Sequence, residues 1–139
     1  MSDHERDATL DLASERVPVL KRRVGWRTWE ALPLVRDVVL FGRDPEAVDV
    51  VLDHPSVSKV HARVEVRAGP ERPCWIEDLG SRNGTLVNRA RLTASRELHP
   101  GDIVSLGALR YTFEREPFLD ILPWLPPVLP SETTDGSPS

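Results

Sequence analysis

Three short clusters of polar residues interrupt the sequence, and each contains a group that can bind an anion or a peptide. They are Phe41-Gly42-Arg43, the segment from Ser56 to His61, and the segment from Leu79 to Thr85 with Asn88 after it. An arginine keeps its charge at any cellular pH, and its planar guanidinium can pair two oxygens of one phosphate. A serine hydroxyl is a compact donor, and an asparagine carboxamide both donates to and accepts from a peptide main chain. The three clusters together contain the groups needed to bind a phosphate and an extended peptide.

A phosphothreonine carries close to two negative charges near neutral pH, so its receptor needs a cation and fixed hydrogen-bond donors. We expect Arg43 to supply the cation, and Ser58 to supply its hydroxyl and its backbone N–H to one phosphate oxygen. Taken alone, an arginine after a glycine is most often a solvated surface residue, and a loop serine most often serves the turn. The prediction therefore depends on the three clusters occurring together.

In this order and spacing the clusters resemble the signature of forkhead-associated (FHA) domains, over roughly residues 34–113. The residues that flank the clusters also match this signature, at 49–52, 77–79, 101–102 and 106–107. The resemblance implies an all-β fold, a twisted sandwich of two antiparallel sheets with about 10–11 short strands. It also implies a module that recognises phosphothreonine.

The resemblance implies a role for each residue of the clusters. Ser58 binds the phosphate, and Lys59 adds a further contact. Arg82 contacts the phosphate or its flanking residues, Asn83 binds the peptide main chain, and Ser81 is grouped with these ligand-binding residues. Four residues support the site structurally: Gly42, His61, Gly84 and Asn88.

Two of the supporting roles have a stated physical reason. The family packs the matching histidine inward, so His61 is expected to brace the loop that holds Ser58. Gly84 is expected to supply a backbone conformation that is costly for a residue with a β-carbon.

The sequence departs from the family pattern at two positions. Arg89 stands where the family commonly has glycine, so we expect Asn88 to take the positive φ of that turn instead. Ser56 stands where some relatives have an arginine that selects an acidic residue three places after the phosphothreonine. This chain therefore lacks that selector.

Catalytic and metal-binding alternatives fit the sequence less well. Ser58, His61 and Asp78 are the residue types of a nucleophilic triad, but a histidine packed inward cannot serve one. The four histidines show no paired ligand spacing for a metal. Cys74 stands beside Trp75 at the start of a predicted strand, where it is expected to pack. We expect neither an enzyme nor a cofactor. The remaining alternative is a scaffold domain that binds proteins through a sheet face, independently of phosphate.

Short runs of valine, leucine and aromatic residues between turn residues predict the strands that must position these loops. The clearest pattern is at 61–66, where Ala62, Val64 and Val66 share one face and His61, Arg63 and Glu65 the other. Pro100-Gly101 predicts a type II turn over residues 99–102. The predicted strands are Val17–Arg23, Arg27–Leu34, Val38–Phe41, Val50–Leu52, Val60–Arg67, Trp75–Leu79, Leu86–Val87, Ile103–Leu106 and Arg110–Glu114.

The 139 residues allow one domain with tails. We expect an FHA domain at 16–116, a flexible acidic tail at 1–15, and a tail at 117–139 that is first proline-rich and apolar, then disordered. We expect the apolar part, Phe118–Leu125, to pack on the sandwich rather than dock another protein.

The composition of the chain limits the classes of partner that we expect it to bind. A net charge of -4 argues against a nucleic-acid partner, and no apolar stretch is long enough for a membrane helix. The single cysteine and the absence of a signal-peptide pattern predict a cytoplasmic protein. The expected partner is a protein phosphorylated by a Ser/Thr kinase. Thr9, Thr133 and Thr134 are candidate targets in the chain's own tails.

Overall fold

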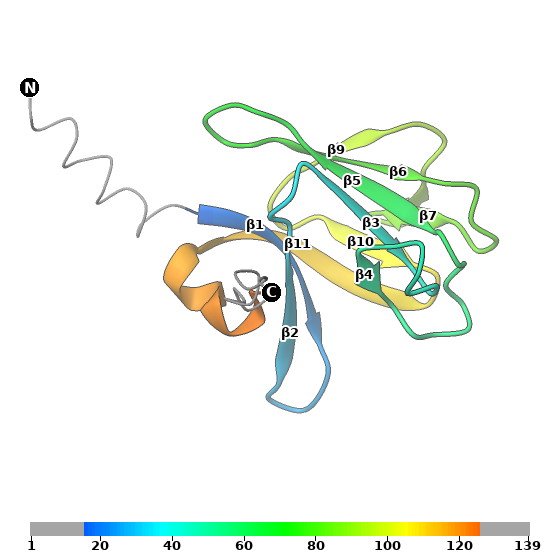
Figure 1. The fold of residues 1–139 in the computed structure, drawn as a ribbon, viewed down its shortest axis with the longest axis horizontal. Coiled ribbons are helices and arrows are strands. Elements are labelled where there is room, and N and C mark those ends of the chain that lie inside the picture. Colours follow the sequence, from blue (N-terminus) through cyan, green and yellow to red (C-terminus); the bar gives the residue numbers. More distant parts are fainter. Residues whose placement is uncertain (1–15, 126–139) are drawn as a thin grey trace, which may run out of the picture.

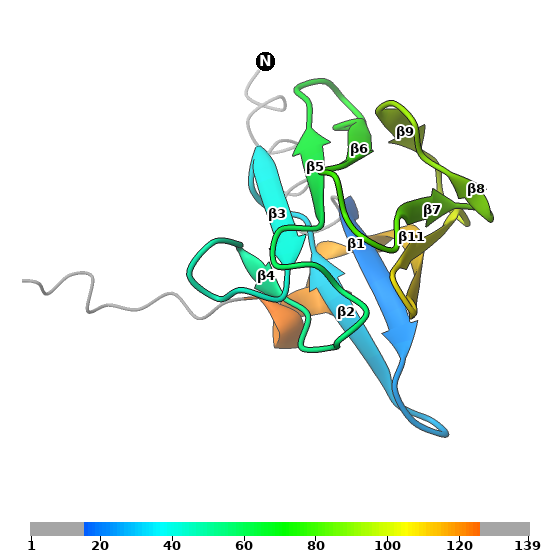
Figure 2. The same ribbon diagram turned by 90° about the vertical axis from the view of Figure 1, so that its right-hand side faces the viewer.

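Two β-sheets packed face to face form the fold. The computed structural model describes residues 16–125. One sheet has the order β2-β1-β11-β10-β7-β8, and the other has the order β4-β3-β5-β6-β9. Figure 1 shows the sandwich from the side, with the helical turn η1 at one end, and Figure 2 shows β3, β5 and β6 in a layer separate from β1, β2 and β11.

The predicted all-β sandwich is confirmed, with eleven strands among the described residues. Every pairing is antiparallel except that of β3 with β4, which is parallel. The elements are β1 Arg16–Arg23, β2 Trp29–Pro33, β3 Val38–Gly42, β4 Val50–Val51, β5 Ala62–Val66, β6 Cys74–Asp78, β7 Thr85–Val87, β8 Ala90–Arg91, β9 Arg96–Leu98, β10 Ile103–Leu106, β11 Leu109–Pro117 and η1 Phe118–Trp124.

The alternation in β5 is as predicted for the strand itself, but not for the residue before it. Ala62, Val64 and Val66 are buried, and Arg63 and Glu65 face outward. His61, which the strand alternation puts on the outer face and the family resemblance packs inward, is fully buried, as the resemblance implies. It lies before the first residue of β5, so the strand's alternation does not set the direction of its side chain.

Two turns can be compared directly with the sequence predictions. Gly101 has φ +95° and the Asp102 N–H donates to the His99 carbonyl at 2.9 Å, so the type II turn is confirmed. Between β7 and β8, Asn88 takes a positive φ of 52° as expected, but Arg89 takes one as well, 73°. The type I′ turn of a two-residue hairpin has positive φ at both central residues. The expectation that Asn88 would replace the missing glycine alone is therefore wrong.

The main core joins both sheets, with Phe41, Tyr111 and Phe113 as its largest members. Cys74 packs there, and burial raises the pKa of its thiol to about 11. A second, smaller cluster joins Ile121 of η1 to Val17 and Val19 of β1, with Phe118 and Leu125 at its edge. The apolar segment after residue 117 thus packs on the sandwich, as expected.

The predictions for the tails at 1–15 and 126–139, including Thr9, Thr133 and Thr134, fall outside the described residues. Within residues 16–125, no helix has the length and apolar character needed to cross a bilayer.

Candidate functional site

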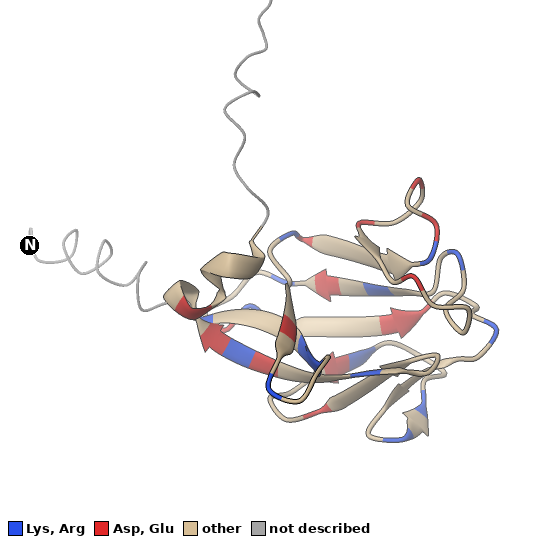
Figure 3. Ribbon diagram, turned by 90° about the horizontal axis from the view of Figure 1, so that it is seen from below, with Lys and Arg blue, Asp and Glu red and all other residues tan. Residues whose placement is uncertain are grey.

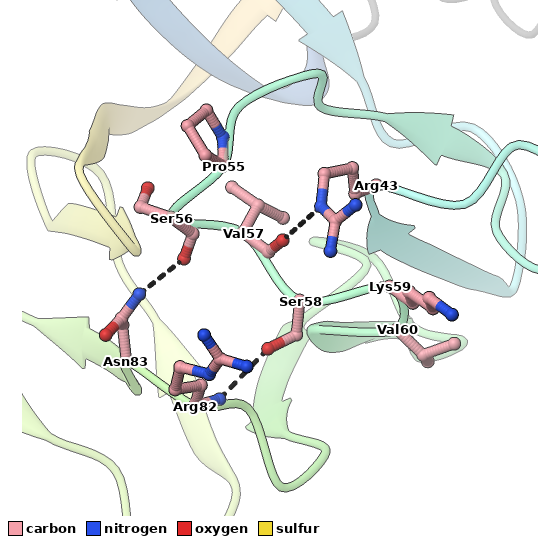
Figure 4. Close-up of a pocket in the computed structure, with 9 residues that line it drawn as sticks. All are labelled: Arg43, Pro55, Ser56, Val57, Ser58, Lys59, Val60, Arg82 and Asn83. Atoms are coloured by element: carbon pink, nitrogen blue, oxygen red, sulfur yellow. Dashed lines mark hydrogen bonds between the residues drawn. The ribbon is translucent and has the colours of Figure 1, made fainter.

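The three polar clusters meet in one depression of about 460 Å³ (Figure 4). Arg43 follows the end of β3, the segment 52–61 joins β4 to β5, and the turn 79–84 joins β6 to β7. Figure 3 shows Lys and Arg on several loops at this end of the sandwich, away from η1. The depression is lined by Arg43, Pro55, Ser56, Val57, Ser58, Lys59, Val60, Arg82 and Asn83. Five of the six predicted ligand-binding residues therefore lie together, and Ser81 is the exception.

Arg43 is held against the loop that carries Ser58. Its backbone N–H donates to the carbonyls of Ser58 and Lys59 at 3.0 and 3.1 Å. Its Nε donates to the Val57 carbonyl at 2.9 Å (Figure 4). Within residues 16–125 its guanidinium has no acidic partner. Both terminal nitrogens of a positioned cation are thus left for an anion.

Gly42 permits the close contact between the end of β3 and this loop. A β-carbon at Gly42 would lie 2.1 Å from the Lys59 carbonyl oxygen and 2.8 Å from its carbon. The obstacle is backbone and cannot swing aside. The side chain of Lys59 is exposed and, in the described part of the chain, forms no ion pair.

Ser58 bonds within its own loop and to the turn at 79–84, in a way that differs from the prediction. Its Oγ accepts the Arg82 N–H at 2.9 Å, and its own N–H donates to His61 Nδ1 at 3.0 Å. The backbone N–H expected to bind phosphate is therefore already used inside the fold. The hydroxyl hydrogen has no acceptor among the described residues and remains available.

His61 connects the Ser58 loop to the turn at 79–84. Since Nδ1 accepts the Ser58 N–H, the proton of the neutral imidazole lies on Nε2, which donates to the Gly84 carbonyl at 2.9 Å. Both ring nitrogens are thus occupied, and neither bonds the Ser58 hydroxyl. Ser58, His61 and Asp78 do not form a triad.

Asp78 organises the turn from the inside, and Ser81 belongs to its network. The Ser81 hydroxyl donates to Asp78 Oδ1, and Thr85 donates to the same oxygen at 2.7 Å. Burial raises the pKa of Asp78, but the hydrogen bonds from Ser81, Thr85 and two backbone N–H groups outweigh it and hold the pKa below its usual 3.8. Ser81 is 8% exposed and does not line the depression. Its grouping with the phosphate-binding residues is corrected to a role in holding the turn.

Asn83 and Arg82 are exposed at the tip of that turn. Asn83 Nδ2 donates to the Ser56 carbonyl at 2.8 Å (Figure 4), which leaves one amide hydrogen and Oδ1 for a ligand. Gly84 has φ +86°, and a β-carbon there would lie 2.8 Å from Arg91 Nε. Asn88 acts further away, by binding Asp102 and the Ile103 N–H.

Sequence reasoning missed the role of Ser56. Its Oγ accepts the Ala108 N–H at 2.8 Å and contacts His54 Nδ1 at the same distance, so it ties the loop to the β10–β11 turn. A β-carbon at Gly107 would lie 2.4 Å from the Ser56 carbonyl. The spacing His54-Pro55-Ser56 was the available signal for a local side-chain turn.

The described residues contain no group of three or more His, Cys, Asp or Glu side chains placed to hold a metal ion. The arrangement can bind an anion and an extended main chain.

Comparison with known proteins agrees with this geometry. The family model for the FHA domain matches residues 39–107. Smad nuclear-interacting protein 1 of Mus musculus is 34% identical over 113 residues, which cover 66% of this chain and 28% of that protein. The chain spans between 10% and 28% of the length of the first three curated relatives it matches.

Two similar solved structures contain phosphopeptides. The MEK1 FHA domain bound to a phosphothreonine peptide of HOP1 is 25% identical, with a TM-score of 0.57, covering 70% of this chain and 94% of that chain. Mycobacterium tuberculosis EmbR in complex with a low-affinity phosphopeptide is 25% identical, with a TM-score of 0.61, covering 81% of this chain and 29% of that chain. On its sequence match, its sandwich and its converging loops, this chain carries an FHA domain, matched over residues 39–107.

Proposed function

We propose that this FHA domain binds a phosphothreonine on a partner protein in the depression at its loop end. One observation carries the proposal: Arg43, Lys59 and Arg82 are exposed around one depression, and no acidic side chain of the described residues pairs with them. In a chain whose net charge is -4, three unpaired cations at one place indicate an anionic guest.

In this proposal each residue has a distinct task. Arg43 pairs two phosphate oxygens through its terminal nitrogens, and the Ser58 hydroxyl donates to a third. Lys59 and Arg82 neutralise the remaining charge, and the free amide hydrogen and Oδ1 of Asn83 bind the peptide main chain. Charge-assisted hydrogen bonds contribute about 1.5–3 kcal/mol each. Three or four of them support a micromolar affinity, about 8 kcal/mol, after the cost of association.

Contacts within the fold support the loops of the site. Gly42 lets the end of β3 contact the backbone of Lys59, and the His61 ring joins the loop that carries Ser58 to the Gly84 carbonyl, so little ordering remains to be done when a peptide binds. The bound peptide is not transformed, and binding is the whole function.

We expect the ligand to be a cytoplasmic protein phosphorylated by a Ser/Thr kinase. Pro55 and Val60 are the apolar members of the lining with exposed surface, and they are the candidate contacts for the γ-methyl group that distinguishes threonine from serine. The chain's own Thr9, Thr133 and Thr134 remain alternative ligands. Mass spectrometry after kinase treatment tests them, and three unmodified threonines would remove that source.

An oriented phosphothreonine peptide library tests the proposal and supplies a consensus. We expect the wild-type domain to retain phosphothreonine peptides, to lose them after phosphatase treatment, and to bind matched phosphoserine peptides more weakly. Equal retention of phosphorylated and dephosphorylated peptides would contradict the proposal and support a phosphate-independent scaffold.

A further inference from the structure

The β1–β2 hairpin extends beyond the sandwich. β1 pairs with β11 only as far as Lys21 opposite Thr112, but it stays paired with β2 up to Arg23 opposite Trp29. The N–H groups of Val24 and Gly25 close the tip by donating to the Thr28 carbonyl at 2.9 and 3.3 Å. The tip therefore projects from the body of the domain (Figures 1 and 2). We call residues 21–29 the hairpin tip.

The hairpin tip exposes large apolar side chains. Trp26 is 83% exposed, Val24 is 47% exposed and Trp29 is 44% exposed. None of them belongs to either buried cluster, so much of their apolar surface is left in contact with solvent. Exposed tryptophans on a protruding element are typical of surfaces that contact another molecule.

The same nine residues carry four cations and no acid. Lys21 pairs with Glu116 at 3.1 Å and Arg22 with Glu30 at 3.4 Å. Arg23 and Arg27 have no acidic partner among residues 16–125. They lie instead over tryptophan rings: Arg23 is 5.2 Å from the centre of Trp29, and Arg27 is 5.1 Å from the centre of Trp26.

Stacking prepares these two arginines for carboxylates. A guanidinium held over an aromatic ring loses side-chain freedom, yet its in-plane N–H groups still point outward as a fork. That fork matches the two oxygens of a carboxylate. The hairpin tip thus presents two preorganised forks with apolar surface beside them.

We propose that the hairpin tip is a second binding surface, for an acidic segment of the same phosphorylated partner. This inference rests on the proposed function of the depression. Charge complementarity favours an acidic peptide over nucleic acid. A nucleic-acid strand carries a charge at every step and needs a continuous cationic track, whereas here Glu116 and Glu30 pair with the other two cations of the tip, Lys21 and Arg22. A short acidic segment needs only two carboxylates.

The two surfaces can be reached by one peptide. The path from Trp26 runs five residues to Lys21, crosses to Thr112, and runs four residues to Ala108, which bonds Ser56 in the depression. At about 3.3 Å per residue and about 5 Å between strands, the separation is at most about 40 Å. An extended linker of about 12 residues spans that distance.

Fluorescence anisotropy with two matched peptides tests the proposal. Both contain the same phosphothreonine core and a flexible linker of about 12–15 residues; one ends in an Asp/Glu cluster and the other in an Asn/Gln cluster. We expect the acidic peptide to bind the wild-type chain at least about tenfold more tightly in about 50 mM salt, with the gain shrinking at high salt.

Variants locate the effect. Arg23→Ala with Arg27→Ala should abolish the gain, and Trp26→Ala should reduce it. The control pair, Arg96→Ala with Arg110→Ala, removes the same charge from exposed strand positions outside the depression and should keep the gain. If the double variant has a lower melting temperature than the wild type, the single variant Arg27→Glu, which changes the tip alone, replaces it in this test.

The outcomes separate this proposal from the proposed function. Equal binding of the two peptides by the wild-type chain, or a gain that survives in the hairpin variants, would overturn the second surface while phosphothreonine binding stands. If neither phosphopeptide binds through the depression, but the acidic segment alone binds wild type and loses affinity in the Arg23/Arg27 variant, the hairpin surface stands and the proposed function fails. Tighter binding of a single-stranded oligonucleotide, lost in that variant, would overturn the acidic partner.

Discussion

The imidazole of His61 determines whether the two ligand-binding loops keep their positions. His61→Ala would leave the partly buried Ser58 N–H and the buried Gly84 carbonyl without their partner and would open a cavity. We expect the free energy of unfolding to fall by about 3 kcal/mol, measured by urea denaturation. A variant as stable as the wild type would show that the loops hold without this bridge.

Arg89 stores backbone strain in the β7–β8 turn. Its φ of 73° lies in the left-handed region, which costs a residue with a β-carbon about 1–2 kcal/mol. Arg89→Gly should therefore raise the free energy of unfolding by about 1 kcal/mol, measured by urea denaturation. Asn88→Gly is the control. It also relieves backbone strain, but that gain is offset by loss of the hydrogen bonds from the Asn88 side chain to Asp102 and to the Ile103 N–H. An equal gain in both variants would refute the strain argument.

Asp78 should make stability depend on pH. Burial raises its pKa, but hydrogen bonds from Ser81, Thr85 and the backbone lower it below 3.8. A carboxylate whose pKa is lower in the folded state stabilises the fold above its unfolded pKa, and that contribution is lost as the pH falls below about 4. Urea midpoints should therefore drop more steeply from about pH 5 to pH 2 in the wild type than in Asp78→Asn. Parallel profiles would contradict this role.

Among the elements, η1 extends the sandwich with a small core of its own. Ile121 is 2% exposed between Val17 and Val19, whereas Leu122 in the same turn is 47% exposed. Ile121→Ala should lower the free energy of unfolding by about 3 kcal/mol. Leu122→Ala should change it by less than about 0.5 kcal/mol. Thermal and urea unfolding of the two variants would show this difference, and equal effects would mean that η1 does not dock through Ile121.

Strands with an apolar sequence pattern could be predicted from the sequence, and two short strands without one, β8 and β9, could not. β5 shows apolar alternation and was predicted, with bounds one or two residues too wide. β8 has two exposed residues, and β9 buries only Leu98, so neither carries a pattern of period two. The two strands of the hairpin are predicted separately, as Val17–Arg23 and Arg27–Leu34. That the tip between them projects from the sandwich is not predicted, because the pairing of β1 with β11 depends on residues distant in sequence.

For the whole molecule, convergence of the site could be predicted but its internal hydrogen bonds could not. Arg43, Ser58 and Asn83 belong to clusters that a resemblance can recognise, and the fold brings them to one depression. The inward direction of Ser81 and the use of the Ser58 N–H by His61 depend on neighbours that are distant in sequence. Residue type alone does not specify which of several partners a hydroxyl or an N–H will take.

The central claim is that the depression binds phosphothreonine through Arg43. Calorimetric titration with a peptide selected from the library tests it in the wild type, in Arg43→Ala and in the control Arg96→Ala. We expect micromolar binding to the wild type and the control, and an affinity at least about tenfold weaker in Arg43→Ala with the fold intact. Unchanged affinity in Arg43→Ala would contradict the claim.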